Sequence, residues 1–152
     1  MERAHRSRAD RCLPTASTPR QSHQPASGVI LDSDVLIEVL RGNAQTARWI
    51  ATEASTGETL RYSPVSRAEI GAGMRAKEEM GIAALFAGLD AVTIDASTGE
   101  LAGDRLRRYR RSHGLELGDA LIGASALQYG ERLATFNRRH YPGITRLALP
   151  DR

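Results

Sequence analysis

Residues 28–37 read GVILDSDVLI, and the rest of the chain is interpreted from this stretch outward. The apolar residues 29–31 favour a strand and run directly into Asp32, so a short buried strand is expected to end there. Ser33 and Asp34 are good N-cap residues for a helix that carries the second apolar run. In open α/β sheets, ligands bind outside the carboxyl ends of the strands. The acidic pair therefore marks a candidate site, with helix capping as its alternative role.

The composition is that of one ordinary globular domain. The chain has 152 residues, of which 41% are hydrophobic and 26% are charged. No apolar run approaches the roughly 20 residues of a membrane span. Cys12 is the only cysteine, which excludes an intrachain disulfide and a cysteine-based metal site. We expect an intracellular, cytoplasmic protein.

The positive charge is concentrated at the N-terminus. The formal net charge is +3, and residues 1–27 hold five arginines against two acids, so the rest of the chain is neutral. Residues 1–27 are also nearly free of large apolar side chains, which predicts a disordered basic extension followed by one domain at 28–152. A targeting signal and a non-specific nucleic-acid-binding arm are the alternatives for this extension.

Strand patterns and helix patterns alternate along the chain. We expect strands at 29–31, 59–63, 91–94, 133–135 and 145–149, with helices between them, including 44–54, 98–112 and a buried apolar helix at 120–127. This alternation predicts an α/β fold in which helices cover both faces of a central, mostly parallel sheet.

Polar residues follow several of these strands. Asp32 follows the first strand, Glu69 the second, Asp119 opens the buried helix and Asn137 follows the fourth strand. Ser66 lies three residues before Glu69, so a capping box is the alternative explanation for this glutamate. Because the ends of parallel strands share one edge of a sheet, we expect these side chains to converge.

Converging carboxylates repel one another unless a cation neutralises them. All-oxygen ligands select a hard ion, Mg²⁺ or Mn²⁺, over zinc. A divalent ion with open positions for water and phosphate is suited to phosphodiester hydrolysis. The pattern therefore indicates a metal-dependent phosphodiesterase site.

Four blocks of sequence carry a resemblance to a known family. They are VILDSDVLIEVLRG at 29–42, SPVSRAEIGAG at 63–73, LGDALIGASAL at 117–127 and LATFNRRHYPGI at 133–144. In order, spacing and chemistry they resemble a PIN domain and, within that family, the VapC toxins of bacterial toxin–antitoxin pairs. The resemblance implies a three-layer α/β/α fold, a Mg²⁺-dependent ribonuclease acting on RNA, a homodimer, and inhibition by a small VapB-like antitoxin encoded beside it.

The resemblance also implies roles for individual residues. Asp32, Glu69 and Asp119 take the catalytic positions, and Asp32 and Asp119 are the expected metal ligands. Asn137 takes the fourth position, where many PIN domains have aspartate, so we expect a single tightly held ion.

Further polar residues surround these positions. Thr135 and Ser33 are expected to support the acids through their hydroxyls or to serve only as a strand residue and a cap. Asp34 is expected to cap its helix or to contact metal-coordinated water. His140 is expected to be an exposed loop residue or an RNA contact.

Arginines are the expected phosphate contacts. Arg138 and Arg139 adjoin Asn137, and the 98–112 helix is expected to carry an outward-facing basic run, with Arg108 as its RNA-binding member. This run comprises Arg105, Arg107, Arg108, Arg110 and Arg111. A merely solvated helix face is the alternative.

Two other functions stay open from the sequence. A catalytically inert PIN domain would bind RNA or antitoxin without cleavage. A haloacid-dehalogenase-like phosphatase would use Asp32 as nucleophile and Asp34 as acid and base, but the only lysine, Lys77, lies within a helix and Gly123 stands where that family has a second acid. A dinucleotide-binding domain is excluded, since no glycines follow the first strand.

Overall fold

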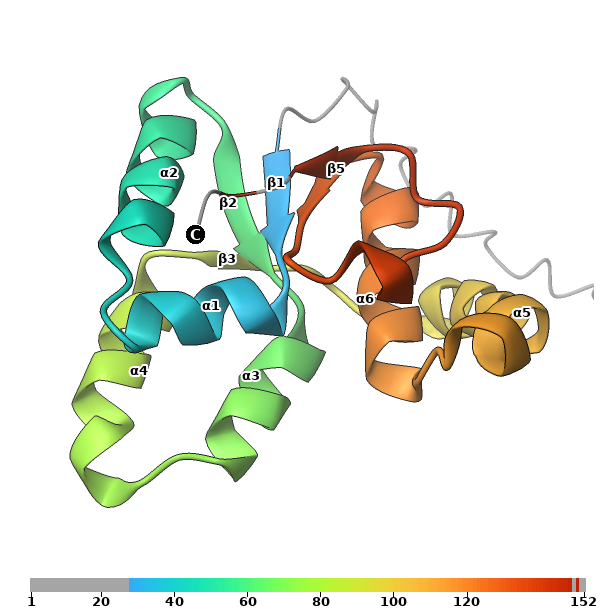
Figure 1. Cartoon of the computed structure of the whole chain (residues 1–152), viewed down its shortest axis with the longest axis horizontal. Coiled ribbons are helices and arrows are strands. Elements are labelled where there is room, and N and C mark those ends of the chain that lie inside the picture. The colour runs from blue at the N-terminus through green and yellow to red at the C-terminus, as the bar shows by residue number, and fades with distance from the viewer. Residues whose placement is uncertain (1–27, 149, 151–152) are drawn as a thin grey trace, which may run out of the picture.

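In the part of the chain that the structure describes, five parallel strands form a sheet with helices on both faces (Figure 1). The computed structural model describes residues 28–148 and 150, so the predicted extension at 1–27 lies outside the described residues. The strands are β1 (Gly28–Leu31), β2 (Thr59–Tyr62), β3 (Asp90–Ala91), β4 (Arg132–Ala134) and β5 (Leu147–Ala148). The helices are α1 (Ser33–Leu40), α2 (Ala44–Ser55), α3 (Pro64–Ala72), α4 (Glu79–Ala87), α5 (Ala96–His113) and α6 (Leu117–Tyr129), with the 3₁₀ turns η1 (Ala76–Glu78) and η2 (Arg138–His140).

The strand order places β1 at the centre of the sheet. The order is β3-β2-β1-β4-β5, and every neighbouring pair is parallel. All the carboxyl ends therefore lie at one edge, where Asp32 N donates to Ala134 O at 2.9 Å. This arrangement confirms the predicted three-layer α/β fold with a parallel sheet, and it brings the segments after β1 and β4 side by side.

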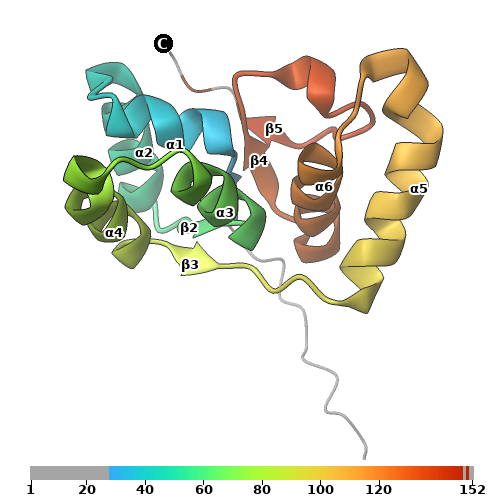
Figure 2. The same cartoon turned by 90° about the horizontal axis from the view of Figure 1, so that it is seen from below.

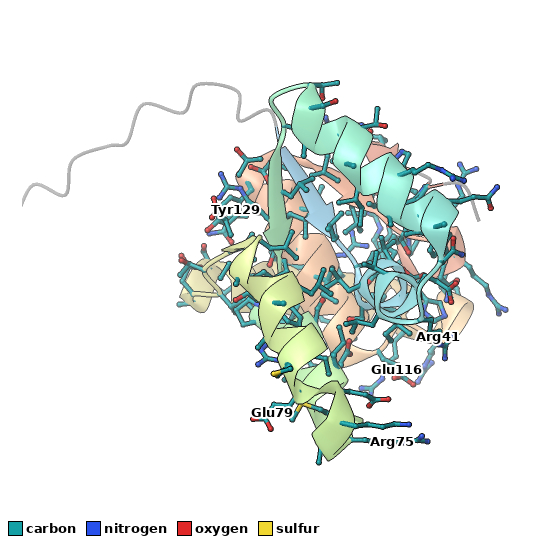
Figure 3. All side chains as sticks on the ribbon, turned by 90° about the vertical axis from the view of Figure 1, so that its left-hand side faces the viewer. Arg41, Arg75, Glu79, Glu116 and Tyr129 are labelled. Carbon is teal, nitrogen blue, oxygen red and sulfur yellow. The ribbon has the colours of Figure 1, made fainter. Side chains whose placement is uncertain are left out.

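Alternate residues of β1 supply both hydrophobic layers. Val29 and Leu31 pack in a cluster with residues of α1, α3 and α4, and Trp49 of α2 covers its side. Figure 3 shows α2 and α4 in front of β1 and β2 on this face. Ile30 faces the opposite layer, where it packs with Ile122 of α6. A strand buried on both faces must be apolar throughout, as the run at 29–31 is.

Helix α6 lies between the sheet and α5 (Figure 2). Its small residues Ala120 and Ala124 pack against Ala102 of α5 and are fully buried. Covering on two sides explains why this helix lacks a polar face over most of its length. The prediction of a buried apolar helix at 120–127 is correct except at Leu127, which is exposed.

Two predicted helix starts are wrong. The N-cap of α1 is Asp32, one residue before Ser33 and Asp34, so the alternative of a helix-capping role is confirmed for Asp32, whereas Asp34 lies inside the first turn. The N-cap of α3 is Ser63, whose hydroxyl accepts from Val65 N, and Pro64 occupies the first helical position. Ser66 is therefore buried inside the first turn of α3 and does not form a capping box with Glu69.

Smaller differences concern lengths. Asp95 caps α5 together with Thr98, so this helix begins at Ala96 and not at 98. β3 pairs with β2 over only two residues, and β5 also spans two. Among the described residues, no helix is both long and apolar enough to span a bilayer.

Candidate active site

Asp32 lies at the end of the central strand and is almost completely buried, with 6% of its surface exposed. Its Oδ1 accepts from Ser33 N at 2.7 Å, and its Oδ2 accepts from the Thr135 hydroxyl at 2.8 Å. Burial and, next, the nearby Asp34 charge raise the pKa of Asp32 from 3.8 to about 7, although these hydrogen bonds oppose the rise. The fold therefore holds a carboxylate where its charge is poorly solvated.

Asp34 does not cap α1 and instead joins α1 to the segment after β4. Its Oδ2 accepts from Phe136 N at 3.0 Å and lies 3.3 Å from the Thr135 hydroxyl. The backbone N of Asn137 donates to the same hydroxyl oxygen at 2.9 Å. The Thr135 hydroxyl therefore links the acidic pair to the segment after β4. Its contact with Asp32 agrees with the expectation that this hydroxyl supports the acids.

Glu69 approaches the site from α3. The Ser33 hydroxyl donates to Glu69 Oε2, which links the first turn of α1 to α3. On its other side, a Cβ atom at Gly118 would lie 2.6 Å from Glu69 Oε1, so the glutamate lies directly against the start of α6. The glutamate therefore connects the starts of two helices at the carboxyl edge instead of capping its own helix.

Asp119 stands in the first turn of α6 and is paired with His140. The distance from His140 Nδ1 to Asp119 Oδ2 is 3.0 Å. Burial raises the pKa of Asp119 above 3.8, His140 lowers it, and the Glu69 charge raises it again. The His140 side chain is 37% exposed, in line with an exposed loop residue, but it also contacts Asp119 and so ties η2 to α6.

Tyr141 is a member of this site that sequence reasoning missed. It is 1% exposed, and its hydroxyl makes no hydrogen bond of normal geometry within the described residues. The hydroxyl is nevertheless near enough to Asp32 to lower the pKa of that carboxyl. Burial and the charges of Asp32, Asp119 and Asp34 raise the pKa of Tyr141 well above its usual value, so the phenol stays protonated. The sequence signal that could have identified Tyr141 is the presence of a large aromatic residue within a polar loop.

The remaining predicted residues lie farther out. Asn137 is exposed at the start of η2, and Arg138 and Arg139 within η2 are exposed as well. Arg108 is exposed on α5 with its guanidinium 5.6 Å from the Tyr109 ring centre. Arg105 does not belong to the predicted outward-facing run, because it is 5% exposed.

A cavity of about 510 Å³ opens beside Glu69 between α1, α3 and α4. Its walls combine an apolar surface with charged residues at the rim. They include Ile37, Leu40, Ile70, Met74, Ile82, Arg41, Lys77 and Glu78. Glu69, one of the candidate catalytic residues, therefore lines a cavity with a largely apolar wall.

The donor set suits a hard cation held by few protein ligands. Within residues 28–148 and 150, no group of three His, Cys, Asp or Glu side chains is arranged to hold a metal ion by itself. Mg²⁺ commonly keeps several waters and binds through only one or two carboxylates. Asp32 and Asp119 are carboxylates whose pKa values burial raises, so neutralisation by a cation would relieve both.

Comparison with known proteins identifies the class. The PIN domain family matches residues 29–142, and the chain therefore belongs to that family. Within the family it is similar to Ribonuclease VapC10 of Mycobacterium tuberculosis, with 39% identity over 123 residues that cover 80% of this chain and 92% of that protein. Ribonuclease VapC19 of the same species is 31% identical over 122 residues, covering 80% of this chain and 98% of that protein.

A solved structure supports the same fold. VapBC2 from Rickettsia felis, bound to a DNA fragment from its promoter, superposes with a TM-score of 0.67 at 18% identity. The match covers 80% of this chain and 96% of that chain. The family match and the two VapC relatives confirm the sequence-based assignment to VapC-like PIN domains, and the structural match supports the fold.

Proposed function

We propose that this chain is a Mg²⁺-dependent endoribonuclease that acts as the toxin of a toxin–antitoxin pair. The observation that carries the proposal is that Glu69 lies between Ser33 and Gly118, the chain neighbours of Asp32 and Asp119, at the carboxyl edge of a PIN-domain sheet where Asp32 is almost completely buried. The ribonuclease names of its VapC10 and VapC19 relatives support the choice of RNA as substrate.

In this proposal Asp32 and Asp119 hold the divalent cation, with Mn²⁺ as a substitute for Mg²⁺. When bound, the cation supplies Lewis acidity toward the phosphate and toward the attacking water. In this proposal Glu69 accepts a proton from that water, and the position of its side chain between the starts of α1 and α6 supports this role. The exposed Arg138 and Arg139, with Arg108, bind flanking phosphates. The Thr135 hydroxyl supports Asp32, and the Ser33 hydroxyl supports Glu69.

Cleavage of RNA with and without the metal tests this function. The full chain should cut RNA in Mg²⁺, lose that activity in EDTA, and lose it as Asp32→Asn. Cleavage that survives EDTA or the substitution would rule out the metal-dependent mechanism. Hydrolysis of a small phosphomonoester through a trapped aspartyl phosphate would instead favour the phosphatase. Binding of RNA without cleavage would favour the inert PIN domain.

We further propose a VapB-like antitoxin as partner and a homodimer as the assembly. Solved neighbours include toxin–antitoxin complexes such as that from Klebsiella pneumoniae, with a TM-score of 0.62 at 22% identity over 82% of this chain and 98% of that chain. A short reading frame immediately upstream is the candidate antitoxin. Light scattering of the purified chain should give twice the monomer mass, and a monomeric result would contradict the dimer.

The cavity beside Glu69 is the surface through which we expect the antitoxin to bind. Met74 lines it, whereas Met80 is highly exposed on α4 and does not. Met74→Lys should weaken antitoxin binding by about 10-fold or more, since it places an unpaired charge in an apolar contact. Met80→Lys is the matched control and should bind normally. Equal affinities of both variants, measured by calorimetry, would contradict this placement.

A further inference from the structure

Arg105 is a buried arginine without a carboxylate partner. The side chain lies on α5 and is 5% exposed, and no ion pair involving it occurs among the described residues. Burying a charge is costly unless it is paired or hydrogen-bonded, and arginine stays charged in proteins. A methionine or leucine would fill the same space without the cost of burying a charge. Packing alone therefore does not explain why an arginine occupies this position.

Within the described part of the chain, the hydrogen bond that Arg105 makes goes to the loop that follows η2. Its Nη2 donates to the Pro142 carbonyl at 3.0 Å, while its Nε has no partner within the described residues. Gly123 of α6 makes room for the contact, because a Cβ there would lie 3.2 Å from Arg105 Nε and 3.3 Å from a ring carbon of Tyr141. Arg105 therefore reaches past α6 to a backbone position adjoining Tyr141.

A second contact from α5 holds the same loop. Tyr109 lies one helical turn after Arg105, and the Arg105 guanidinium carbon is 5.6 Å from its ring centre. A Cβ at Gly143 would lie 2.8 Å from the Tyr109 hydroxyl, and Gly143 has a φ of +74° that other residues rarely adopt. Two side chains of α5 thus contact Pro142 and Gly143, two consecutive residues of the loop, and hold the loop against α5.

The same loop carries two side chains that lie near the carboxylates. His140 reaches Asp119 at 3.0 Å, and the Tyr141 hydroxyl adjoins Asp32. Pro142 directly follows Tyr141, which follows His140, so a shift of the Pro142 carbonyl moves the backbone that carries both side chains. The contacts from α5 and the contacts with the acids therefore fall on neighbouring residues of one loop.

We propose that Arg105 is a positioning residue for the candidate active site, because its buried guanidinium fixes the 138–143 loop that presents His140 and Tyr141 to Asp119 and Asp32. Arg105 acts through this loop and does not itself touch substrate. The inference rests on the proposed nuclease function for its kinetic consequence only, since the order of the loop can be measured independently of activity.

The test compares Arg105→Met, which keeps the apolar bulk but removes the guanidinium, with Arg105→Lys, which keeps a charge and a donor. Arg48→Met, at an exposed position of α2, is the matched control. Hydrogen exchange by mass spectrometry on the full chain follows the amides of residues 138–144 against those of α2. In parallel, kcat and KM are measured on an RNA that the wild-type chain is first shown to cut.

We expect the loop amides of Arg105→Met to exchange about 10-fold faster, with α2 unchanged, because one buried hydrogen bond is lost. The kcat should fall by about 10- to 100-fold at nearly constant KM, since misplaced catalytic groups cost rate more than binding. Arg105→Lys should restore part of both effects, and Arg48→Met should show neither.

Two results would overturn the proposal. Unchanged loop exchange in Arg105→Met would show that the side chain only fills space, and a uniform rise over α5, α6 and the loop would show a general loss of packing. If Arg105→Met does not fold, the same criteria apply to Arg105→Lys. If the wild-type chain cuts no RNA, the nuclease function fails while the exchange data still decide the role of Arg105.

Discussion

At the scale of single residues, the site consists of carboxylates that the fold keeps poorly solvated. Asp32 accepts two hydrogen bonds, and yet burial still raises its pKa to about 7. Such a group destabilises the folded state when it is ionised, and natural sites accept this cost where function needs the charge. Replacing Asp32 with a neutral residue should therefore raise the free energy of unfolding and lower the activity.

The first prediction concerns Asp32→Asn. Between about pH 4 and pH 7 the folded state binds one more proton at Asp32 than the unfolded state, so this residue makes stability fall as the pH rises. At pH 8 the Asn variant should be more stable by about 1–4 kcal/mol, and at pH 4 the difference should nearly vanish. Urea unfolding at both pH values measures this. A less stable variant at pH 8 would contradict it.

The same residue links stability to the metal. Mg²⁺ that binds the folded chain should raise its melting temperature in proportion to the logarithm of concentration above the dissociation constant. The rise should be absent in Asp32→Asn, which provides a readout of metal binding without RNA. A similar rise in both proteins would show that the cation binds elsewhere.

Glu69→Gln separates the two explanations of Glu69. The structure removes the capping box, since Ser63 caps α3 and the Ser33 hydroxyl contacts Glu69. Glutamine can still accept from Ser33, so the melting temperature should stay within a few degrees. RNA cleavage should fall by about 100-fold or more, as expected for loss of a general base. Full activity of the variant would exclude Glu69 from catalysis.

At the scale of elements, the site depends on how closely α3 and α6 approach each other. Gly118 at the start of α6 leaves the space that Glu69 occupies. Gly118→Ala should push the glutamate carboxylate aside while the backbone stays in place, because the obstructing atoms are the end of a flexible side chain. Cleavage should drop by about 10-fold or more with a small change in melting temperature.

Gly71→Ala is the matched control within α3. A Cβ there meets nothing within 4 Å, so alanine should stabilise the helix by about 0.5–1 kcal/mol and leave activity unchanged. Normal cleavage by Gly118→Ala would show that Glu69 tolerates the displacement and that the close approach is not required.

The local sequence predicted the helices and strands more accurately than it predicted the contacts between them. The runs at 29–31 and 120–127 are apolar because both sides of each element are covered, and this is visible from the pattern alone. The start of α3 was misplaced because Ser63 followed by Pro64 and Ser66 followed by Glu69 are both good start signals. Both serines are fully buried, and what distinguishes them is that the Ser63 hydroxyl accepts from Val65 N, which only the folded backbone shows.

Contacts of the 138–143 loop were beyond sequence reasoning for a different reason. A histidine and a tyrosine in a polar loop carry no periodic signal, and their partners lie more than 20 residues earlier in the chain. Likewise, Arg105 belongs to a basic run whose other members are exposed, so its burial depends on the position of α6 and the loop. The placement of Asp32, Asp119 and Glu69 at one edge of the sheet was predictable because parallel strands share that edge.

At the scale of the whole molecule, the described domain contains every residue of the candidate site and its core. Deleting residues 1–27 should therefore leave the melting temperature and metal-dependent cleavage of the remaining chain nearly unchanged. Calorimetry and RNA cleavage on the truncated chain test this. A melting temperature lower by more than about 10 °C would show that the extension contributes to the folded domain.

The hydrogen bond between Asp32 and Thr135 has a consequence for synthesis of the protein. These two residues are 103 positions apart in the sequence. A nascent chain on the ribosome therefore carries its central acid long before the hydroxyl, η2 and Tyr141 have emerged. The site can assemble only after β4, η2 and Tyr141 have left the ribosome, so a nascent chain shorter than this cannot form it.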